Sequence, residues 1–269
     1  MRPAVLLALL IAVPALAAPV PSRMQAADDD LAALLQGPQR SDANRARDQY
    51  RHPVETLRFF GLKPTMTVVE IWPSGGWYTE ILAPYLRDRG HYIAAGSDPA
   101  TTDGAKSVAR FKAKLDADPG SYVKVTVTAF GKDRYDIAPA GSADMVLTFR
   151  NVHNWVEGGF APAAFSAFYR ALKPGGVLGV EEHRLPEGMP DAKQASSGYM
   201  KVSTVRHLAE AAGFRFVAAS DVNANPRDTH DYPKGVWTLP PTYEEGDKDR
   251  ARYAAIGESD RMTLKFVKP

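Results

Sequence analysis

TVVEIWPSGGWYTEILAPYL, from Thr67 to Leu86, reads as a buried strand, a glycine-containing turn and an amphipathic helix. The strand is a short, mostly β-branched apolar run, the turn is punctuated by proline and glycine, and the helix is apolar at helical spacing. The strand residues are Val68, Val69 and Ile71, the turn runs from Pro73 to Gly76, and the apolar helix residues are Tyr78, Ile81, Leu82, Tyr85 and Leu86. Ligands of open α/β sheets bind beyond the carboxyl ends of the strands. We therefore expect a nucleotide-type cofactor site here, with Glu70 at the end of the strand.

Strand and helix patterns alternate along the rest of the chain. Further strands are expected at 92–95, 122–128, 144–149, 177–180, 214–219 and 261–267, and helices at 102–115, 161–172 and 203–212. This βαβ order predicts an α/β fold with a mostly parallel sheet and helices on both faces.

Composition excludes several classes of function. The 269 residues carry a formal net charge of +2, which gives no global electrostatic reason to expect nucleic acid as a partner. Cysteine is absent, so disulfides, thiol catalysis, zinc–thiolate sites and a lipid anchor on cysteine are excluded. A small-molecule ligand is the expected partner, and the sequence leaves the oligomeric state open.

Residues 1–17 are predicted to be a signal peptide. Arg2 provides a positive start, an apolar run follows from Val5 to Val13, and Ala15 and Ala17 form a small-x-small cleavage site. The apolar run is too short for a stable membrane span. We expect cleavage near Ala17 and a periplasmic or secreted protein.

An extension with helices is predicted at 18–52, followed by the main domain at 53–269. The extension carries Arg45, Arg47 and Arg51, which form either a solvated, ion-paired face or a ligand clamp. Tyr50 is a candidate substrate-binding residue in the same segment.

Several segments together resemble the class I S-adenosylmethionine-dependent methyltransferases. They are the strand and glycine turn, Asp144 to Leu147, Leu172-Lys173-Pro174-Gly175-Gly176, and Ala211-Ala212-Gly213-Phe214, in that order. Gly75 to Pro84, Asn223 to Pro226 and Ile256 to Met262 resemble, more closely, an exported bacterial group of such proteins. The resemblance implies a Rossmann-like, seven-stranded sheet of order 3-2-1-4-5-7-6, whose last two strands form an antiparallel pair. It also implies S-adenosyl-L-methionine as the cofactor and methyl transfer to an unknown small or envelope-associated acceptor.

The cofactor motif of that family has an acid followed by three alternating glycines, and this sequence matches it in part. Glu70 matches the acid and Gly76 the last glycine, with Gly75 beside it. Trp72 and Ser74 stand at the other two glycine positions, where a side chain resists positive φ. Trp72 is expected either to stack on a ligand or to pack in the core.

The family's second strand ends in an acid that binds the ribose hydroxyls of the cofactor. Gly96 occupies the matching position here, and Asp98 follows two residues later. A bulge or a longer turn brings Asp98 into place; otherwise the ribose loses its charged acceptor. Glu70, Trp72, Ser74, Gly75, Gly76 and Asp98 are the candidate cofactor-binding residues.

The end of the fourth main strand concentrates polar and aromatic groups. His153 is a candidate general base, and Asn151 and Asn154 are candidates for orienting the acceptor. The alternative role of His153 is to cap the following helix or bond a buried carbonyl. Trp155 is a candidate substrate contact.

Four ionisable residues, Glu181 to Arg184, follow the fifth strand. Alternation places Glu181 with His183 on one side and Glu182 with Arg184 on the other. His183 and Arg184 are candidate substrate-binding residues, and surface ion pairing is the alternative. A metal site of Glu181, His183 and His153 is a weaker hypothesis, because no established ligand spacing is present.

Residues 221–260 form a long insertion rich in Asn, Pro, Asp and aromatic residues. It is either a lid that lines the substrate pocket or an extended wrap over a sheet edge. His230 and Trp237 are its candidate substrate-binding residues.

Three hypotheses for function follow. The first is an exported methyltransferase. The second is a non-catalytic binding module whose cofactor pocket is remodelled by Trp72, Ser74 and Gly96. The third is a metal-assisted hydrolase built on His153 and His183. Export favours the second, because a cytosolic cofactor is not generally expected outside the inner membrane.

Overall fold

A computed structural model describes residues 30–269. The predicted signal peptide at 1–17 and its cleavage site near Ala17 lie outside these residues. Among the described residues no helix is long and apolar enough to cross a membrane.

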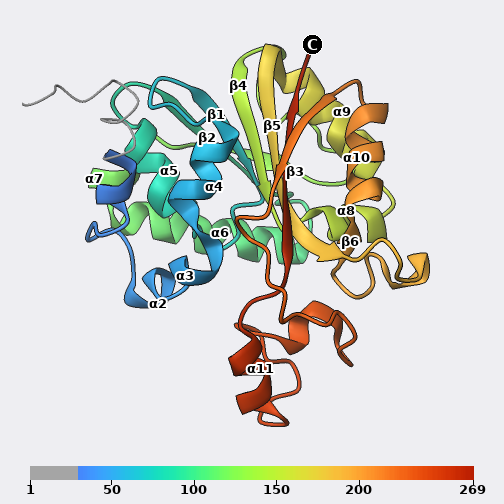
Figure 1. Ribbon diagram of the computed structural model, residues 1–269. Helices are drawn as coiled ribbons and strands as arrows, with labels where there is room; N and C mark the ends of the chain where they lie inside the picture. The colour runs from blue at the N-terminus through green and yellow to red at the C-terminus, as the bar shows by residue number, and fades with distance from the viewer. Residues whose placement is uncertain (1–29) are drawn as a thin grey trace, which may run out of the picture.

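The core of the fold is one mostly parallel sheet (Figure 1). The strands are β1 Thr67–Ile71, β2 His91–Ser97, β3 Thr126–Phe130, β4 Ala143–Phe149, β5 Leu172–Leu185, β6 Met200–Lys201, β7 Arg215–Ser220 and β8 Arg261–Val267. Their order is β3-β2-β1-β4-β5-β8-β7, and the two-residue strand β6 pairs with β5. Strand β8 is antiparallel to both β5 and β7. The predicted fold and strand order are confirmed, with β6 as an addition.

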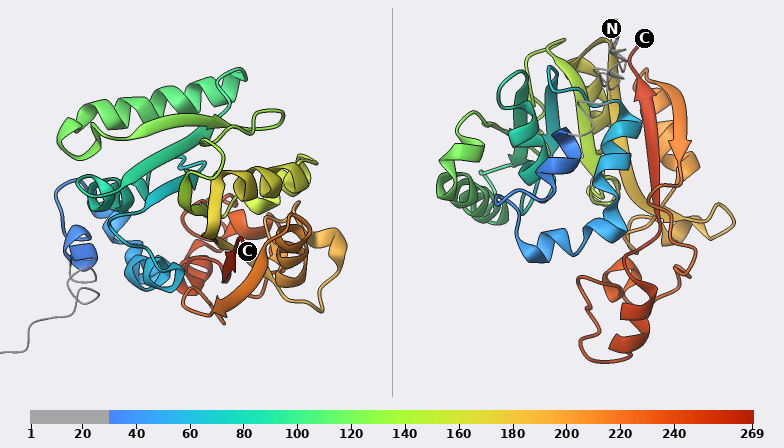
Figure 2. Two further views of the ribbon diagram at one scale, coloured as in Figure 1. Left: turned by 90° about the horizontal axis from the view of Figure 1, so that it is seen from above. Right: turned by 60° about the vertical axis from the view of Figure 1, so that its left-hand side comes forward.

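Helices cover both faces of the sheet (Figure 2). They are α2 Asp42–Arg45, α3 Asp48–Arg51, α4 Pro53–Phe60, α5 Thr79–Leu86, α6 Thr102–Ala117, α7 Pro119–Tyr122, α8 Val152–Glu157, α9 Ala161–Ala171, α10 Val202–Ala211 and α11 Arg250–Ile256, with 3-10 turns η1 Asp191–Lys193 and η2 Gly235–Thr238. One apolar core joins the sheet to α8, α9 and α10, and a second joins it to α4, α5 and α6. Trp155 lies in the first core and Tyr78 in the second.

Local signals explain where several helices begin and end. Pro53 stands at the first turn of α4, and Gly61 ends that helix with φ +87°. The Thr101 side chain caps α6 by accepting a hydrogen bond from the Gly104 amide at 3.0 Å. These caps hold the helices that flank β1 and β2.

Two predicted elements have different bounds in the structure. The strand expected at 122–128 begins only at Thr126, because Asp118 and Pro119 start the short helix α7, which ends at Tyr122. The strand expected at 177–180 is much longer: β5 runs from Leu172 to Leu185. Its carboxyl end therefore reaches the edge of the sheet where β1 and β4 also end.

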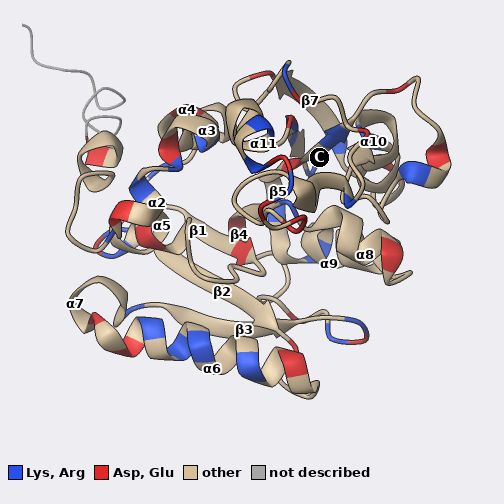
Figure 3. Ribbon diagram, turned by 90° about the horizontal axis from the view of Figure 1, so that it is seen from below, with Lys and Arg blue, Asp and Glu red and all other residues tan. Residues whose placement is uncertain are grey.

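The insertion at 221–260 lies beyond this edge and carries η2 and α11 (Figure 1). It has a small apolar cluster of its own around Tyr232, Leu239 and Tyr253. Asp228 joins it to the segment before β6 by accepting a hydrogen bond from the Tyr199 hydroxyl, and within the insertion it accepts from the Asp260 amide at 2.7 Å. Figure 3 views the molecule from this edge.

Candidate functional site

Two adjoining cavities lie at the carboxyl edge of the sheet. Their volumes are about 260 Å³ and about 330 Å³. Both are lined by Arg47, Arg51, Ser74, Phe149 and Arg150, so they form one cleft. The turn after β1, the end of β4 and the segment around α3 meet there, as expected for an open α/β sheet.

The turn after β1 forms one wall of the cleft. Trp72 and Ser74 have left-handed φ angles of 49° and 53°, and Gly76 has a φ of 78°. The Gly76 amide donates to the Pro73 carbonyl at 2.8 Å and closes the turn. The family's glycine conformation is thus adopted here with two side chains present, which costs on the order of 1 kcal/mol at each position.

The Trp72 side chain packs against aromatic residues at the ends of neighbouring elements. Its Nε1 donates to the Phe130 carbonyl at 2.8 Å. Its ring lies edge-on to Phe130, Trp155 and Phe160, with centroids 5.7, 5.9 and 6.3 Å away. Trp72 therefore fills the space between the ends of β1 and β3, and borders the first cavity at the same time.

Glu70 also borders the first cavity but is largely buried. It accepts hydrogen bonds from the Tyr92 hydroxyl at 2.5 Å and from Thr79 Oγ1 at 3.4 Å. Burial raises the pKa of Glu70 to about 7, against the opposing effect of these bonds and of Arg150. At neutral pH the carboxyl is partly protonated.

The end of β2 does not supply an acceptor to the cleft. Gly96 has no side chain there, and Asp98 pairs with Arg134 Nε at 3.1 Å. Asp98 also accepts a hydrogen bond from the Ala100 amide at 3.0 Å, and it lines neither cavity. The bulge that would bring Asp98 into the cleft is not present.

These positions decide how S-adenosylmethionine fits the chain. Glu70, Ser74 and Gly75, which lie in the segment that resembles the family's cofactor motif, border the first cavity. Trp72 packs against Phe130, and Asp98, the candidate acceptor for the ribose, lines neither cavity. The candidate residues for the amino-acid end of the cofactor therefore line the cleft, and the candidate acceptor for its ribose does not.

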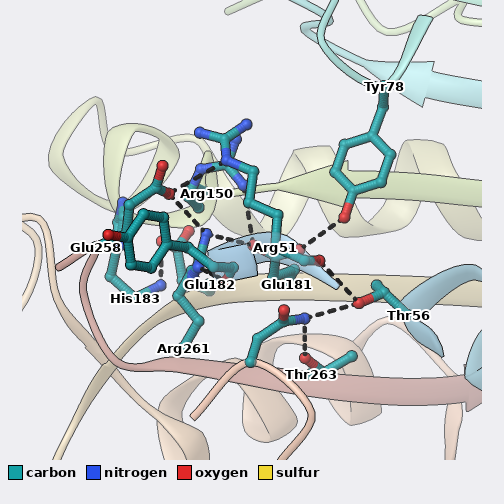
Figure 4. A network of polar contacts seen from close by, with 12 residues as sticks. Arg51, Thr56, Tyr78, Arg150, Glu181, Glu182, His183, Glu258, Arg261 and Thr263 are labelled. Atoms are coloured by element: carbon teal, nitrogen blue, oxygen red, sulfur yellow. Dashed lines mark hydrogen bonds and ion pairs between the residues drawn. The ribbon is translucent and has the colours of Figure 1, made fainter. Parts of the chain in front are cut away.

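The floor of the cleft is a buried ionic network (Figure 4). Glu181 accepts from Arg150 Nη1 at 2.9 Å, from the Tyr78 hydroxyl at 3.2 Å, and pairs with Arg261 at 3.3 Å. Glu258 pairs with Arg47, Arg51 and Arg261 at 2.6, 3.2 and 3.2 Å. Burial opposes the charge of Glu258, but the arginines outweigh it and lower its pKa to about 2. The Tyr78 ring stacks on Phe149 beside this network, with centroids 3.5 Å apart.

His153 lies in the second cavity, with a carboxylate behind it. Its Nδ1 lies 3.1 Å from Glu182 Oε1. Glu182 also accepts from the Val152 and His153 amides at 2.5 and 3.3 Å and from the His183 amide at 2.8 Å. Glu182 thus caps α8 and holds the His153 ring through Nδ1. Within residues 30–269 Nε2 has no hydrogen-bond partner, an arrangement suited to a general base.

A metal site is a weaker description of the same residues. His153, Glu182 and His183 offer ligand atoms that lie within 4.8 Å of one another. Both Glu182 oxygens are already committed to four donors, and a metal would have to displace them. Glu181, the carboxylate expected as a ligand, is held by arginines instead.

His183 and Trp237 also line the second cavity. His183 Nδ1 lies 2.6 Å from Ser259 Oγ, and burial lowers the His183 pKa well below its usual value, with a contribution from His153. The Trp237 ring stands edge-on to His153, with centroids 5.9 Å apart. Val236, Pro240 and Pro241 continue this apolar wall. The insertion therefore contributes one side of the cleft.

The remaining candidate residues divide between the cleft and other places. Asn151 and Asn154 line the second cavity, and Asn151 Nδ2 donates to the Ile71 carbonyl at 3.0 Å. Gly76 lies at the base of the turn and lines neither cavity. Four further candidates also lie outside the two cavities. Tyr50 lines a separate hollow, and Trp155 is buried in the core. Arg184 Nε donates to Asp260 at 2.8 Å, and His230 Nε2 lies 3.5 Å from the same carboxylate.

Sequence reasoning did not select Arg47, Arg51, Arg150 and Glu258 as site residues. The four-residue spacing of Arg47 and Arg51 was a usable signal, because it puts both side chains on one helical face. Arg150 directly precedes the selected cluster. No local pattern connects them to Glu258, which is more than two hundred residues away from Arg47.

The fold is that of the S-adenosylmethionine-dependent methyltransferases. The chain superposes on such an enzyme from Aquifex aeolicus with a TM-score of 0.57 at 15% identity, covering 90% of this chain and 98% of that one. For the arsenic(III) methyltransferase of Chlamydomonas reinhardtii the TM-score is 0.50 at 14% identity, covering 89% and 73%. The cyclase SpnF superposes with a TM-score of 0.58 at 18% identity, covering 93% and 98%. No family model and no curated protein matches the sequence.

Proposed function

We propose that the protein binds a small molecule in this cleft and does not use S-adenosylmethionine as a methyl donor. The observation that carries the proposal is the Trp72 side chain, which fills the space between β1 and β3 and is bonded to the Phe130 carbonyl. The ion pair of Asp98 with Arg134 supports it. A fold alone does not define a reaction, and the neighbour SpnF is named as a cyclase.

The test is calorimetric titration of the purified protein with S-adenosylmethionine and S-adenosylhomocysteine. We expect no binding at millimolar ligand. The variant Trp72→Gly removes the indole and restores the glycine that tolerates positive φ. If the indole is what excludes the cofactor, this variant gains measurable affinity, whereas Trp155→Phe, an aromatic core change next to it, does not. Micromolar binding by the wild type, about −8 kcal/mol, would overturn the proposal.

Methyl transfer to a small or envelope-associated acceptor is the second candidate. It is favoured by Glu70, Ser74 and Gly75, which border one cavity, and by His153, which is oriented by Glu182 in the next one. A methyltransferase would need His153 only for an acceptor that loses a proton. Unchanged turnover of an identified acceptor by His153→Ala would remove this residue from the mechanism.

We also propose that the protein acts outside the cytoplasm after its leader is removed. The sequence of residues 1–17 supports this, and the absence of cysteine is compatible with an oxidising compartment. Fractionation of cells that express the C-terminally tagged chain tests it. We expect the processed form in the periplasm or medium, and an Ala17→Arg variant to keep the mass of the precursor. A wild-type chain found unprocessed in the cytoplasm would contradict export.

A further inference from the structure

The cleft holds more buried positive charge than its acids neutralise. Its network contains four guanidinium groups, those of Arg47, Arg51, Arg150 and Arg261, with side-chain exposures of 25, 4, 18 and 1%. Two carboxylates, Glu181 and Glu258, pair with all four. The network therefore carries two positive charges in excess.

Among the described residues, the other nearby acids form no ion pair with these four arginines. The two oxygens of Glu182 accept hydrogen bonds from the amides at the start of α8 and from the His183 amide, and one of them contacts His153 Nδ1. Glu70 is bonded to two hydroxyls, and its pKa of about 7 leaves it partly uncharged at neutral pH. Like charges held together with little solvent are costly, so an arrangement of this kind needs a compensating partner.

Several guanidinium N–H groups also have no acceptor within residues 30–269. Arg47 and Arg51 each use Nε on Glu258 and leave both terminal nitrogens without a bond there. Arg150 donates from Nη1 to Glu181, and its Nη2 has no acceptor among the described residues. These three arginines are the ones that line both cavities. The donors without acceptors and the uncompensated charge thus coincide in the cleft.

Arg51 is held in place by an aromatic ring, which does not neutralise it. Its guanidinium lies over the Trp77 ring at 4.7 Å from the centroid, and Arg40 lies over the same ring at 5.0 Å. Burial lowers the pKa of Arg51, and the neighbouring charge of Arg150 adds to this. Pre-positioned donors of this kind lower the entropy cost of binding an anion.

The number of donors indicates which anion fits. A phosphate monoester carries three terminal oxygens and close to two negative charges at pH 7. Guanidinium groups bind such oxygens in pairs through their planar forks. Three arginines and two excess charges match this group better than a single carboxylate. The wall of Val236, Trp237 and Pro240 offers apolar surface next to it.

We propose, building on the small-molecule binding proposed above, that the cleft recognises a phosphate monoester. Arg47, Arg51 and Arg150 hold the phosphate. The organic part lies along Val236 and Trp237, next to His153.

The experiment is calorimetric titration at low ionic strength, because salt screens partly exposed charges. The probes are phenyl phosphate, inorganic phosphate, phenyl sulfate and succinate. We expect phenyl phosphate to bind with submillimolar affinity, at least tenfold more tightly than singly charged phenyl sulfate. Inorganic phosphate should bind more weakly than the ester, because it makes no contact with the apolar wall. Tighter binding of succinate would overturn the assignment to phosphate, and equal binding of ester and inorganic phosphate would overturn the role of the wall.

Variants separate recognition from general attraction. Arg51→Gln and Arg150→Gln should each weaken phenyl phosphate binding at least tenfold. Arg110→Gln, an exposed arginine on α6, should leave the binding unchanged. An equal effect of all three variants would reduce the finding to non-specific charge and overturn the proposal.

Stability without ligand provides a second readout. If the arginines are kept for a ligand, Arg51→Gln relieves repulsion and leaves the unfolding midpoint unchanged or higher. If the wild type binds no phosphate ester at millimolar concentration and Arg51→Gln unfolds, the cluster is purely structural and the proposal fails.

S-adenosylmethionine is titrated alongside the phosphate esters. Its binding would refute the proposed function, whereas a missing response to phosphate esters alone refutes only this inference.

Discussion

The two sides of the carboxyl edge of the sheet differ in how they are filled. At the ends of β1, β2 and β3, Trp72 packs against Phe130, and Asp98 is paired with Arg134. At the ends of β1, β4 and β5, the edge stays hollow and is lined by Arg51 and Arg150. The first side is filled by apolar packing and by polar groups that have partners. The second side is open and carries more guanidinium groups than the carboxylates that pair with them.

Under the proposed function, this difference lets the fold keep its topology while its ligand changes. Filling the space beside Phe130 costs little, because a tryptophan in an apolar site gains packing energy and needs only one acceptor for its N–H. Keeping several arginines close together costs free energy that apolar packing does not return. The open side therefore holds the arginines that the proposed ligand would contact, and substitutions can test each side separately.

The largest effect is expected from Arg261→Met. Arg261 is 1% exposed, contacts both Glu181 and Glu258, and donates to the Tyr50 carbonyl. Its removal takes a partner from two buried carboxylates, and we expect the free energy of unfolding to fall by about 3 kcal/mol. Urea denaturation measures this change.

The control is Arg184→Met, whose ion pairs with Asp221 and Asp260 are more exposed. It should cost only about 1 kcal/mol. If the two variants cost the same, Arg261 has no special structural role under the cleft. Comparing the stability change of Arg261→Met with that of Arg51→Gln separates the arginine that supports the cleft from an arginine that faces its ligand.

A pH-dependent effect of about 2 to 3 kcal/mol is expected at Glu70, where the two sides of the edge meet. Burial raises its pKa from 4.5 to about 7, while Tyr92, Thr79 and Arg150 oppose the shift. The folded state therefore binds a proton more tightly than the unfolded state. This contribution to stability is present at low pH and is lost as the pH rises from 4.5 through 7.

Glu70→Gln removes this titration. Relative to the variant, the wild type should lose about 2 to 3 kcal/mol of unfolding free energy between pH 5 and pH 8. Urea denaturation of both proteins at the two pH values gives the difference. Parallel pH profiles would mean that the carboxyl is charged in the folded protein throughout this range.

The fold was predictable from sequence because its signals are local. The β-branched run at Val68 and Val69 and the alternation of Met262, Leu264 and Phe266 depend only on neighbouring residues. The order of the strands came from the resemblance in motif order. The extent of β5 was underestimated, because Pro174, Gly175 and Gly176 indicate a turn although the backbone there continues the strand.

The site was only partly predictable, because its residues meet through tertiary structure. The arginines of the cleft come from α3, from the end of β4 and from β8, and no spacing rule connects them. The sequence allowed two interpretations of Arg47 and Arg51, a solvated face or a ligand clamp. Their positions depend on distant residues, because both pair with Glu258 and Arg51 also lies over the Trp77 ring. The capping of α8 by Glu182 likewise needs the pairing of β4 with β5.

A smaller effect is expected on the filled side from Trp72→Phe. The phenyl ring keeps most of the packing, but the Phe130 carbonyl loses its donor, so we expect a loss of about 1 to 2 kcal/mol. Thermal or urea denaturation measures it. Because the space stays filled, this variant should not bind S-adenosylmethionine, in contrast to Trp72→Gly. Equal cofactor binding by both variants would show that the bulk of Trp72 is not the barrier.

The smallest effect is expected from Trp77→Phe, which tests how the open side is held in shape. Trp77 Nε1 donates to the Asn44 carbonyl at 3.1 Å, and its ring carries Arg40 and Arg51 on its surface. Phenylalanine keeps an aromatic face and loses the hydrogen bond, so we expect a loss of about 1 kcal/mol and a change of less than threefold in phenyl phosphate affinity.

Trp77→Leu is the informative partner of that variant, because it removes the aromatic face altogether. If Trp77 positions Arg51 for the ligand, the leucine variant binds phenyl phosphate at least threefold more weakly than the phenylalanine variant, and the two are compared by calorimetry under conditions where both are folded. Equal affinities would show that Arg51 keeps its place through Glu258 alone. The open side would then depend on its carboxylates for shape as well as for charge, because Glu258 pairs with both Arg47 and Arg51.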